Sequence, residues 1–189
     1  ETLRYEIAID SQKAAEMVMA FANLMRYSVY YGSTIVPLQT DIEYINDYLL
    51  LQKMRYNRRL NYHIDIPEEL MDLRIPKLLL QPVVENSLVH GMKDARCISV
   101  TITARQRDSA LVLCVEDNGS GISQEKLKEL REALEQEDIY REHIGLYNSH
   151  RVVRLLYGPA YGLTIESSPG TGTRVSITLP ADMEEDTYV

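Results

Sequence analysis

The hydrophobic period of this chain changes near Asn61, from the 3- and 4-residue spacing of helices to the alternation that is typical of strands. The first part predicts a helix over 13–30 and, after a break at Gly32, a second helix that Pro37 opens and that runs to about residue 60. The first helix carries one seam of apolar or small residues, formed by Ala14, Met17, Phe21, Leu24 and Ser28. The second carries another, formed by Ile42, Ile45, Tyr48 and Leu49. These seams predict a helical hairpin, which either pairs with a second copy in a four-helix bundle or packs only on the rest of the chain.

The remaining sequence predicts strands and helices in the order β-α-β-β-α-α-β-β. Gly91 is the expected glycine cap of the first of these helices, and Gly158 ends the last. Antiparallel strands mixed with helices predict an α+β fold, a two-layer sandwich with a mixed sheet and helices on one face. We expect the strands at 62–66, 98–106, 110–117, 161–168 and 173–180, and the helices at 76–91, 123–136 and 145–158.

Composition narrows the class of protein further. The formal net charge is −8, most of it in 123–142 and in the acidic tail 182–189, which argues against nucleic-acid binding through a basic face. The sequence has no stretch of 18 apolar residues and no signal peptide. Cys97 and Cys114 lie in apolar, strand-like runs without metal-ligand spacing, so both are expected to be buried thiols and no zinc site follows.

The first group of residues that could carry chemistry lies within the apolar helix. Asn86 and His90 are four residues apart and share a face, with Glu85 beside them. Burying such groups without partners is costly, so they face either a ligand-filled cleft or bulk water. An Asn oxygen suits Mg²⁺ and a His can donate to a phosphate. The sequence has neither a GxxxxGK[ST] nor a GxGxxG phosphate motif, so any nucleotide must be held in another way.

Three glycine-containing segments follow. DNGSG at 117–121 ends a buried strand, where the Asp carboxylate can accept a hydrogen bond from an exocyclic amine such as that of adenine, although DNG is also a common turn. Residues 144–148 begin a helix whose free N–H groups form an anion site, and 137–143 ahead of it is a candidate lid. GTGT at 170–173 either places glycine backbone near a ligand or forms a plain hairpin turn.

The order of these segments resembles the nucleotide-binding domain of sensor histidine kinases, in particular their LytS/YesM-type branch. LMRYS (24–28) and YLLLQKMRYNRRL (48–60) resemble that branch's dimerisation helices, so the resemblance covers nearly the whole chain. The boxes of the nucleotide site correspond in order: LQPVVENSLVHG (80–91) is similar to the N box, DNGSG (117–121) to the first glycine box, HIGLYNSHRVVRLLYG (143–158) to the second glycine region and GTGT (170–173) to the third.

The resemblance implies a site for ATP and Mg²⁺. Asn86 would bind the Mg²⁺ and Asp117 the adenine amino group. The remaining implied cofactor-binding residues are Gly119, Gly121 and Ile122 near the base, and Gly145, Leu146, Gly170, Thr171, Gly172 and Thr173 at the phosphates or lid. Glu85, His90 and Asn148 are further candidates, Glu85 as a catalytic residue.

The sequence departs from the pattern of its relatives at three places. Pro82 stands where gyrase-type relatives that hydrolyse ATP have the Glu that activates water, which fits transfer of phosphate to an imidazole instead. His143 replaces the first glycine of the usual GxGL. Positions 1–62 contain no histidine, so we expect the phosphoacceptor histidine upstream of residue 1, and these residues alone are expected not to autophosphorylate.

The resulting prediction is the ATP-binding catalytic core of a two-component sensor histidine kinase. It comprises a dimerisation segment (1–58), a catalytic domain (59–181) and the acidic tail. The resemblance implies a homodimer, a response-regulator receiver domain as partner, and the cytoplasmic part of a membrane-anchored bacterial sensor. The alternatives are a serine-phosphorylating regulator of the same fold and a non-catalytic nucleotide-binding or dimerisation module. Of the other histidines, His63 is expected to be structural and His150 to lie on a helix surface.

Overall fold

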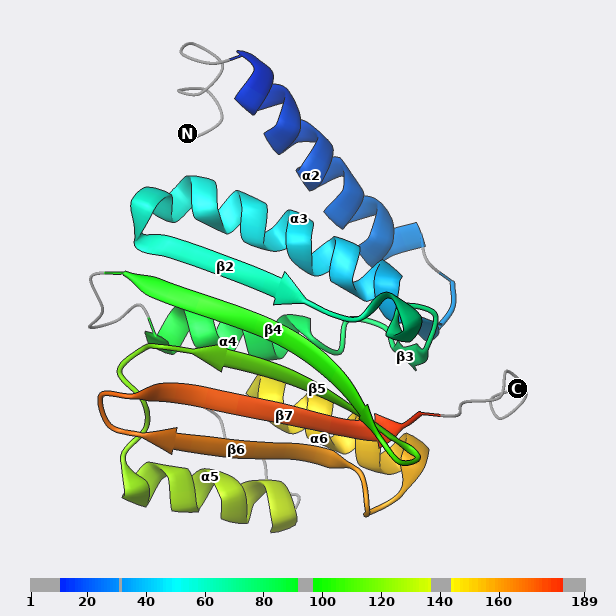
Figure 1. Cartoon of the computed structure of the whole chain (residues 1–189), viewed down its shortest axis with the longest axis vertical. Helices are drawn as coiled ribbons and strands as arrows, with labels where there is room; N and C mark the ends of the chain where they lie inside the picture. Colours follow the sequence, from blue (N-terminus) through cyan, green and yellow to red (C-terminus); the bar gives the residue numbers. More distant parts are fainter. Residues whose placement is uncertain (1–10, 31, 92–96, 137–143, 182–189) are drawn as a thin grey trace.

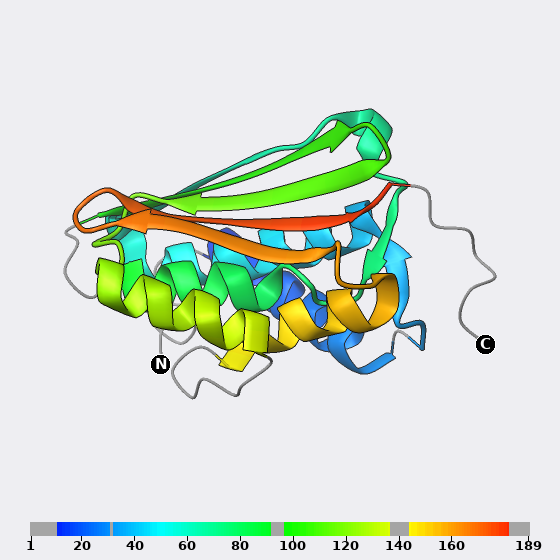
Figure 2. The same ribbon diagram turned by 90° about the horizontal axis from the view of Figure 1, so that it is seen from below.

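The chain folds into two layers. The computed structural model describes residues 11–30, 32–91, 97–136 and 144–181. One layer is a five-stranded sheet, and the helices cover a single face of it (Figure 1 and Figure 2). The predicted fold class, a two-layer α+β sandwich with a mixed sheet, preceded by a helical hairpin, is confirmed. The predicted lid, with His143, and the acidic tail lie outside the described residues.

The elements follow the predicted order, with two short strands and two 3-10 turns in addition. Along the chain they are α2 (Ser11–Tyr30), β1 (Ile35–Pro37), α3 (Leu38–Tyr56), η1 (Asn57–Arg59), β2 (Leu60–Asp65), η2 (Glu68–Leu70), β3 (Arg74–Pro76), α4 (Gln81–Gly91), β4 (Ile98–Arg107), β5 (Ala110–Asp117), α5 (Gln124–Gln136), α6 (Ile144–Tyr157), β6 (Gly162–Ser168) and β7 (Gly172–Pro180).

The large sheet is mixed, with strand order β2-β4-β5-β7-β6. Strand β2 runs parallel to β4, and the other neighbouring pairs are antiparallel. The register pairs Asp117, the last residue of the central strand β5, with Val100 of β4 and Thr173 of β7. Two polar residues far apart in the sequence, Asp117 and Thr173, are thereby fixed side by side at one end of the sheet.

One hydrophobic core joins the sheet to the helices. Leu111, Leu113 and Val115 of β5 are fully buried at alternate positions, as expected for the inward face of a strand. The same core continues through Val84 of α4 to Ile45 of α3. Helix α3 is therefore packed into the core of the sheet layer, and α2 packs on α3.

The buried face of α2 differs from the predicted seam. Ala14 and Met17 are buried as expected, but Phe21 is 60% exposed and Ser28 is also exposed. Their places in the contact are taken by Ala20 and Tyr27. Tyr27 is drawn inward because its hydroxyl donates a 2.9 Å hydrogen bond to the buried carboxylate of Asp41 on α3.

Helix α4 begins at Gln81, five residues after the predicted start. Pro76 lies instead in β3, and Leu78 has a positive φ of 60°, which interrupts a helix. The turn is held by Asp41, whose carboxylate accepts the backbone N–H groups of Leu78 and Leu80. A side chain 37 residues earlier therefore sets where the helix starts.

The expected cap at Gly91 is also different. Gly91 is a helical residue without a positive φ, so it is not a left-handed cap. A Cβ at this position would collide with the Ile98 side chain. A larger residue would have to displace the end of the Ile98 side chain, because α4 lies close against the start of β4.

Two single residues, His150 and Cys97, lie elsewhere than the sequence suggested. His150 is 4% exposed, not on the surface of α6, because that face of the helix packs on β6, where Nδ1 of His150 accepts the Leu163 N–H at 3.0 Å. Cys97 is exposed, since it precedes the first residue of β4, whereas Cys114 is buried as expected. His63 is exposed on the edge strand β2, so burial does not support a structural role.

Candidate functional site

A cavity of about 550 Å³ opens where α4, the end of β5, the start of α5 and β7 meet. Six of the predicted site residues line it, and we call it the Asp117 cavity. Its lining consists of Asn86, His90, Gly91, Asp117, Ser120, Gly121, Ile122, Ser123, Lys126 and Thr173.

Asp117 is the buried charge of this cavity, with only 4% of its surface exposed. Its carboxylate accepts the Gly119 N–H at 2.9 Å, the Ser87 hydroxyl and the Thr173 N–H. Burial raises the pKa of Asp117, and these three hydrogen bonds act in the opposite direction. A carboxylate offers about four acceptor positions. Three protein donors hold the group in place while it keeps acceptor capacity toward the cavity.

The backbone around Asp117 is packed closely by the turn between β6 and β7. Gly172 has a φ of 96°, and a Cβ there would collide with the Asp117 carbonyl oxygen. The Ser167 hydroxyl donates to the Gly172 carbonyl at 2.7 Å and lies 3.0 Å from the Thr173 hydroxyl. Close packing of Gly172 and its turn against the Asp117 backbone therefore fixes the position of Asp117.

Helix α4 presents Asn86 and His90 on one face, and both line the Asp117 cavity, as their four-residue spacing predicts. Glu85 lies on another side of the helix, where it accepts a 2.7 Å hydrogen bond from the Gln81 side chain. Burial of the Tyr48 hydroxyl on α3 and, to a smaller extent, the charge of Glu85 raise the pKa of Tyr48 to about 12. Glu85 therefore faces α3 and is not part of the cavity lining.

The second glycine region lies farther from the cavity than the resemblance implies. Gly145 packs against the Pro82 side chain, which brings the start of α6 close to α4. Leu146 is 1% exposed and belongs to the hydrophobic core, and Asn148 is exposed on α6. Among the described residues, none of these three lines the cavity.

The third glycine segment is divided. Thr173 lines the Asp117 cavity, whereas Thr171 and Gly172 line a smaller adjoining pocket of about 330 Å³. Gly170 sits at the tip of the turn, with open space around its α carbon. Gly119 is buried beside the cavity, where its N–H binds Asp117.

Four polar residues of the site were not predicted. Ser120, Ser123 and Lys126 line the cavity, and the hydroxyl of buried Ser87 holds Asp117. A signal was present for Lys126, because it lies in the first turns of the helix that follows DNGSG. Ser87 gave none, since a Ser within an apolar helix is also compatible with a bond to its own backbone.

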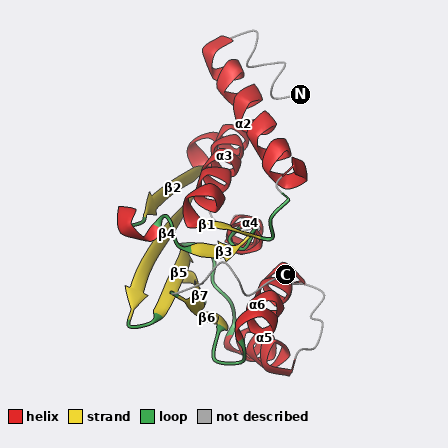
Figure 3. Ribbon diagram, turned by 90° about the vertical axis from the view of Figure 1, so that its right-hand side faces the viewer, coloured by secondary structure: helices red, strands yellow, loops and turns green. Residues whose placement is uncertain are grey.

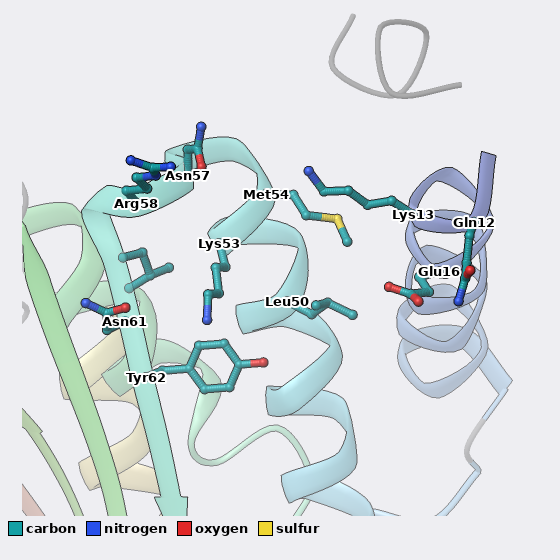
Figure 4. Close-up of a pocket in the computed structure, with 11 residues that line it drawn as sticks. Gln12, Lys13, Glu16, Leu50, Lys53, Met54, Asn57, Arg58, Asn61 and Tyr62 are labelled. Atoms are coloured by element: carbon teal, nitrogen blue, oxygen red, sulfur yellow. The ribbon is translucent and has the colours of Figure 1, made fainter. Parts of the chain in front are cut away.

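A larger cleft of about 680 Å³ lies between α2, α3 and β2 (Figure 4). Lys13, Lys53 and Arg58 lie around it, with Leu50 and Tyr62 among its apolar walls. It holds no buried carboxylate and no glycine-lined backbone among the described residues, so it does not offer the chemistry of the Asp117 cavity. Lys53 and Arg58 belong to a basic stretch, 53–59, that was not predicted to line a cleft.

The described residues offer neither a metal-binding cluster nor a membrane-spanning helix. No cluster of three or more His, Cys, Asp or Glu side chains there is arranged to hold a metal ion. None of the helices formed by these residues has both the length and the apolar character needed to cross a membrane.

Comparison with known families agrees with this geometry. Residues 71–183 match the family model described as "Histidine kinase-, DNA gyrase B-, and HSP90-like ATPase", and residues 1–60 match the model described as "Histidine kinase". The chain therefore belongs to the histidine kinase-, DNA gyrase B- and HSP90-like ATPase family. The order of its boxes, which resembles that of sensor histidine kinases, agrees with both matches.

Individual relatives point the same way. The sensor protein kinase HptS of Staphylococcus aureus is 30% identical over 180 residues, which cover 95% of this chain and 35% of that protein. The chain thus spans about a third of the length of the curated relatives it matches.

Solved structures support the fold. The histidine kinase domain from the Erythrobacter litoralis EL346 blue-light activated histidine kinase aligns with a TM-score of 0.56 at 18% identity, covering 95% of this chain and 84% of that one. The catalytic domain of histidine kinase ThkA aligns with a TM-score of 0.61 at 15% identity, covering 80% and 98%.

Proposed function

We propose that the chain binds Mg-ATP in the Asp117 cavity and serves as the catalytic core of a two-component sensor histidine kinase. The observation that carries this proposal is the buried Asp117 carboxylate, held by three protein donors and still open to a donor in the cavity. An adenine amino group is a donor of the required kind. Ile122 and the Gly121 backbone line the same cavity and suit an apolar, flat base.

The cavity residues also fit the Mg²⁺ that accompanies the triphosphate. Mg²⁺ is usually bound by one or two protein oxygens together with substrate phosphates and water. The Asn86 side chain supplies such an oxygen, and His90 and Lys126 supply donors or positive charge for phosphate oxygens. When bound, the metal neutralises charge on the β- and γ-phosphates during phosphoryl transfer.

For the reaction itself, we infer transfer of the γ-phosphate to a histidine outside these residues and then to an aspartate of a response-regulator receiver domain. Pro82 occupies the position that would carry a water-activating Glu in an ATP hydrolase, and it packs against Gly145. A proline has no group that can accept a proton, which favours transfer over hydrolysis. We further propose that the chain divides into a dimerisation segment (1–58), a catalytic domain (59–181) and an acidic tail. We also propose that it belongs to a membrane-anchored bacterial sensor.

Removing the Asn86 side chain is expected to weaken the magnesium-dependent part of nucleotide binding. By titration calorimetry, the unmodified chain should bind ATP more tightly with Mg²⁺ than with EDTA. In Asn86→Ala we expect the advantage given by Mg²⁺ to fall about tenfold, the size of one contact to a charged group. Binding in EDTA should stay nearly unchanged.

Asn148→Ala provides the matched control, because Asn148 is an exposed Asn on α6 and does not line the cavity. An equal effect in both variants, or a Mg²⁺ advantage that survives Asn86→Ala, would exclude Asn86 as the metal ligand. A chain without any Mg-ATP binding would instead favour the non-catalytic dimerisation module.

We also propose that α2 pairs with a second copy of the chain. One exposed stripe of α2 carries four large apolar residues at intervals of three and four, each about half exposed or more: Val18, Phe21, Met25 and Val29. A surface of this kind is typical of a helix that packs against another helix. The face belongs to the hairpin that the resemblance assigns to dimerisation.

Placing a charge on this face should dissociate the dimer. We expect Phe21→Glu to raise the dimer dissociation constant about 30-fold or more, measured by analytical ultracentrifugation, because a central apolar side chain is replaced by a carboxylate. Leu155→Glu is the control, since Leu155 on α6 is 73% exposed and lies apart from α2. If both variants behave like the unmodified chain, the apolar face of α2 is not the interface.

A further inference from the structure

Asp41 is the most deeply buried acidic group among the described residues. It lies in the first turn of α3 and has 0% of its surface exposed. Its carboxylate accepts hydrogen bonds from three places: the Tyr27 hydroxyl of α2 at 2.9 Å, the Leu78 N–H at 2.7 Å and the Leu80 N–H at 3.3 Å. One carboxylate therefore links α2, α3 and the turn that leads into α4.

The elements joined by Asp41 come together at one end of the molecule. Figure 3 shows the short β1–β3 ribbon beside α4, with α2 and α3 above it. The backbone N–H groups of Leu38 and Gln39, which begin α3, donate to the carbonyls of Leu73 and Met71. The start of α3 is thus anchored to the segment that precedes α4. Of the elements that Asp41 joins, α2 makes the fewest contacts with the sheet layer.

A second chain of hydrogen bonds runs from α3 into α4. The Tyr44 hydroxyl donates to the Gln81 side chain at 2.9 Å, and Gln81 donates to Glu85 at 2.7 Å, one residue before Asn86. Tyr44 also contacts the Tyr27 ring, with centroids 5.0 Å apart. Tyr44 therefore contacts α2 on one side and the first residue of α4 on the other.

We propose that Asp41 is a positioning residue that couples the orientation of α2 to the start of α4, and through α4 to the Asp117 cavity. The consequence for nucleotide rests on the proposed function, whereas the coupling between α2 and the 78–80 turn does not. This gives the LMRYS segment a role beyond packing, because its Tyr27 supplies the α2 arm of the junction.

Electrostatics explains why the junction responds to movement of α2. Burial raises the pKa of Asp41, while its three hydrogen bonds and the charge of Lys77 oppose this. A buried carboxylate that loses one donor is left poorly compensated, so the remaining donors must rearrange or admit water. Since the remaining donors are the N–H groups of Leu78 and Leu80, a change in α2 reaches the turn before α4 directly.

The experiment compares Tyr27→Phe with Asn23→Ala in the full chain. Tyr27→Phe removes only the hydroxyl that binds Asp41 and keeps the ring contact with Tyr44. Asn23→Ala removes another α2–α3 hydrogen bond, from the Asn23 side chain to Asp47 at 2.9 Å, which does not involve Asp41. Amide hydrogen exchange by NMR is followed at Leu78 and Leu80 and along α2, without nucleotide and with Mg-ATP.

We expect Tyr27→Phe to speed exchange at Leu78 and Leu80 about tenfold, the effect of one hydrogen bond to a charged group. Asn23→Ala should leave these two amides unchanged. Coupling between sites is reciprocal, so Mg-ATP should slow exchange along α2 in the unmodified chain and do so less in Tyr27→Phe. A role of Tyr27 in stability alone would not alter this transfer of protection.

Two results would overturn the proposal. One is equal exchange at Leu78 and Leu80 in Tyr27→Phe and Asn23→Ala. The other is Mg-ATP protection of α2 that is the same in Tyr27→Phe as in the unmodified chain. If the unmodified chain does not bind Mg-ATP at all, the proposed function fails, and the nucleotide-free comparison of the two variants still decides the coupling.

Discussion

Replacing Asp117 by Asn is expected to weaken ATP binding about 10- to 100-fold, measured by titration calorimetry with Mg²⁺ present. The substitution keeps the size of the side chain but removes its negative charge, and a hydrogen bond to a charged group contributes about 1.5–3 kcal/mol. It also puts an N–H₂ donor among groups that already donate, namely the Gly119 N–H, the Ser87 hydroxyl and the Thr173 N–H. The site therefore loses both its acceptor for the base and the fit of its own backbone.

Glu116→Gln is the matched control for this variant. Glu116 is the neighbouring residue of β5, but its carboxylate is exposed and pairs with Arg174 at 2.7 Å. The charge change is the same and the cavity lining is untouched. Unchanged ATP affinity in Asp117→Asn would remove the adenine assignment, and an equal loss in both variants would reduce it to an effect of net charge.

The pH dependence of binding follows from the same group. Burial raises the pKa of Asp117 above its ordinary value, so protonation begins at a higher pH than for an exposed Asp. Above that pKa the carboxylate is ionised and can accept the hydrogen bond from the adenine amino group. ATP affinity should accordingly fall as the pH drops through the raised pKa, and Asp117→Asn should lack this fall.

The parts of the site that were predictable from sequence are those whose signal is local. The DNGSG segment is recognisable in the sequence because an acidic residue follows an apolar run. The structure places that residue, Asp117, in the cavity. The spacing of Asn86 and His90 fixes a shared helix face, which also lines the cavity. Short-range periodicity is enough in both cases, because one element determines where the side chain points.

The parts that were missed depend on contacts between distant segments. The start of α4 is set by a hydrogen bond from the Leu78 N–H to Asp41, which lies 37 residues earlier in the chain. Sequence rules for helix starts consider only neighbouring residues and do not include such a distant partner. His150 was predicted to lie on the surface because its helix is amphipathic. In the structure its ring accepts a hydrogen bond from a backbone N–H group of β6. Glu85 sits next to Asn86 in sequence, but 100° of helix turn directs it toward α3.

Glycine positions show the same limit in another form. Gly145, Gly170 and Gly172 were all expected near phosphates, because glycine in such boxes allows a ligand to approach. In the structure Gly145 packs closely against the Pro82 side chain, and Gly172 packs closely against the Asp117 backbone. Gly170, by contrast, has open space around it, so the sequence alone does not tell which glycine permits a close approach, or to what.

Gly172→Ala is expected to destabilise the fold and to disturb the Asp117 cavity together. The added Cβ would collide with the Asp117 carbonyl oxygen at a residue whose φ is 96°, so the backbone of β5 or of the turn must shift. Strain at such a φ together with a forced backbone shift costs about 2–4 kcal/mol. In a chain of this size we expect the melting temperature to fall by roughly 10 °C. ATP affinity should fall as well, since Asp117 is displaced.

Gly170→Ala separates the two causes, because Gly170 lies in the same turn with a φ of 79° but has open space around it. This variant carries the strain of a positive φ without a collision, and we expect a cost of about 1 kcal/mol with ATP affinity unchanged. Equal melting temperatures and equal affinities for the two variants would mean that backbone conformation alone selects glycine at position 172. A larger loss in Gly172→Ala, in both stability and affinity, would assign that glycine to holding Asp117 in place.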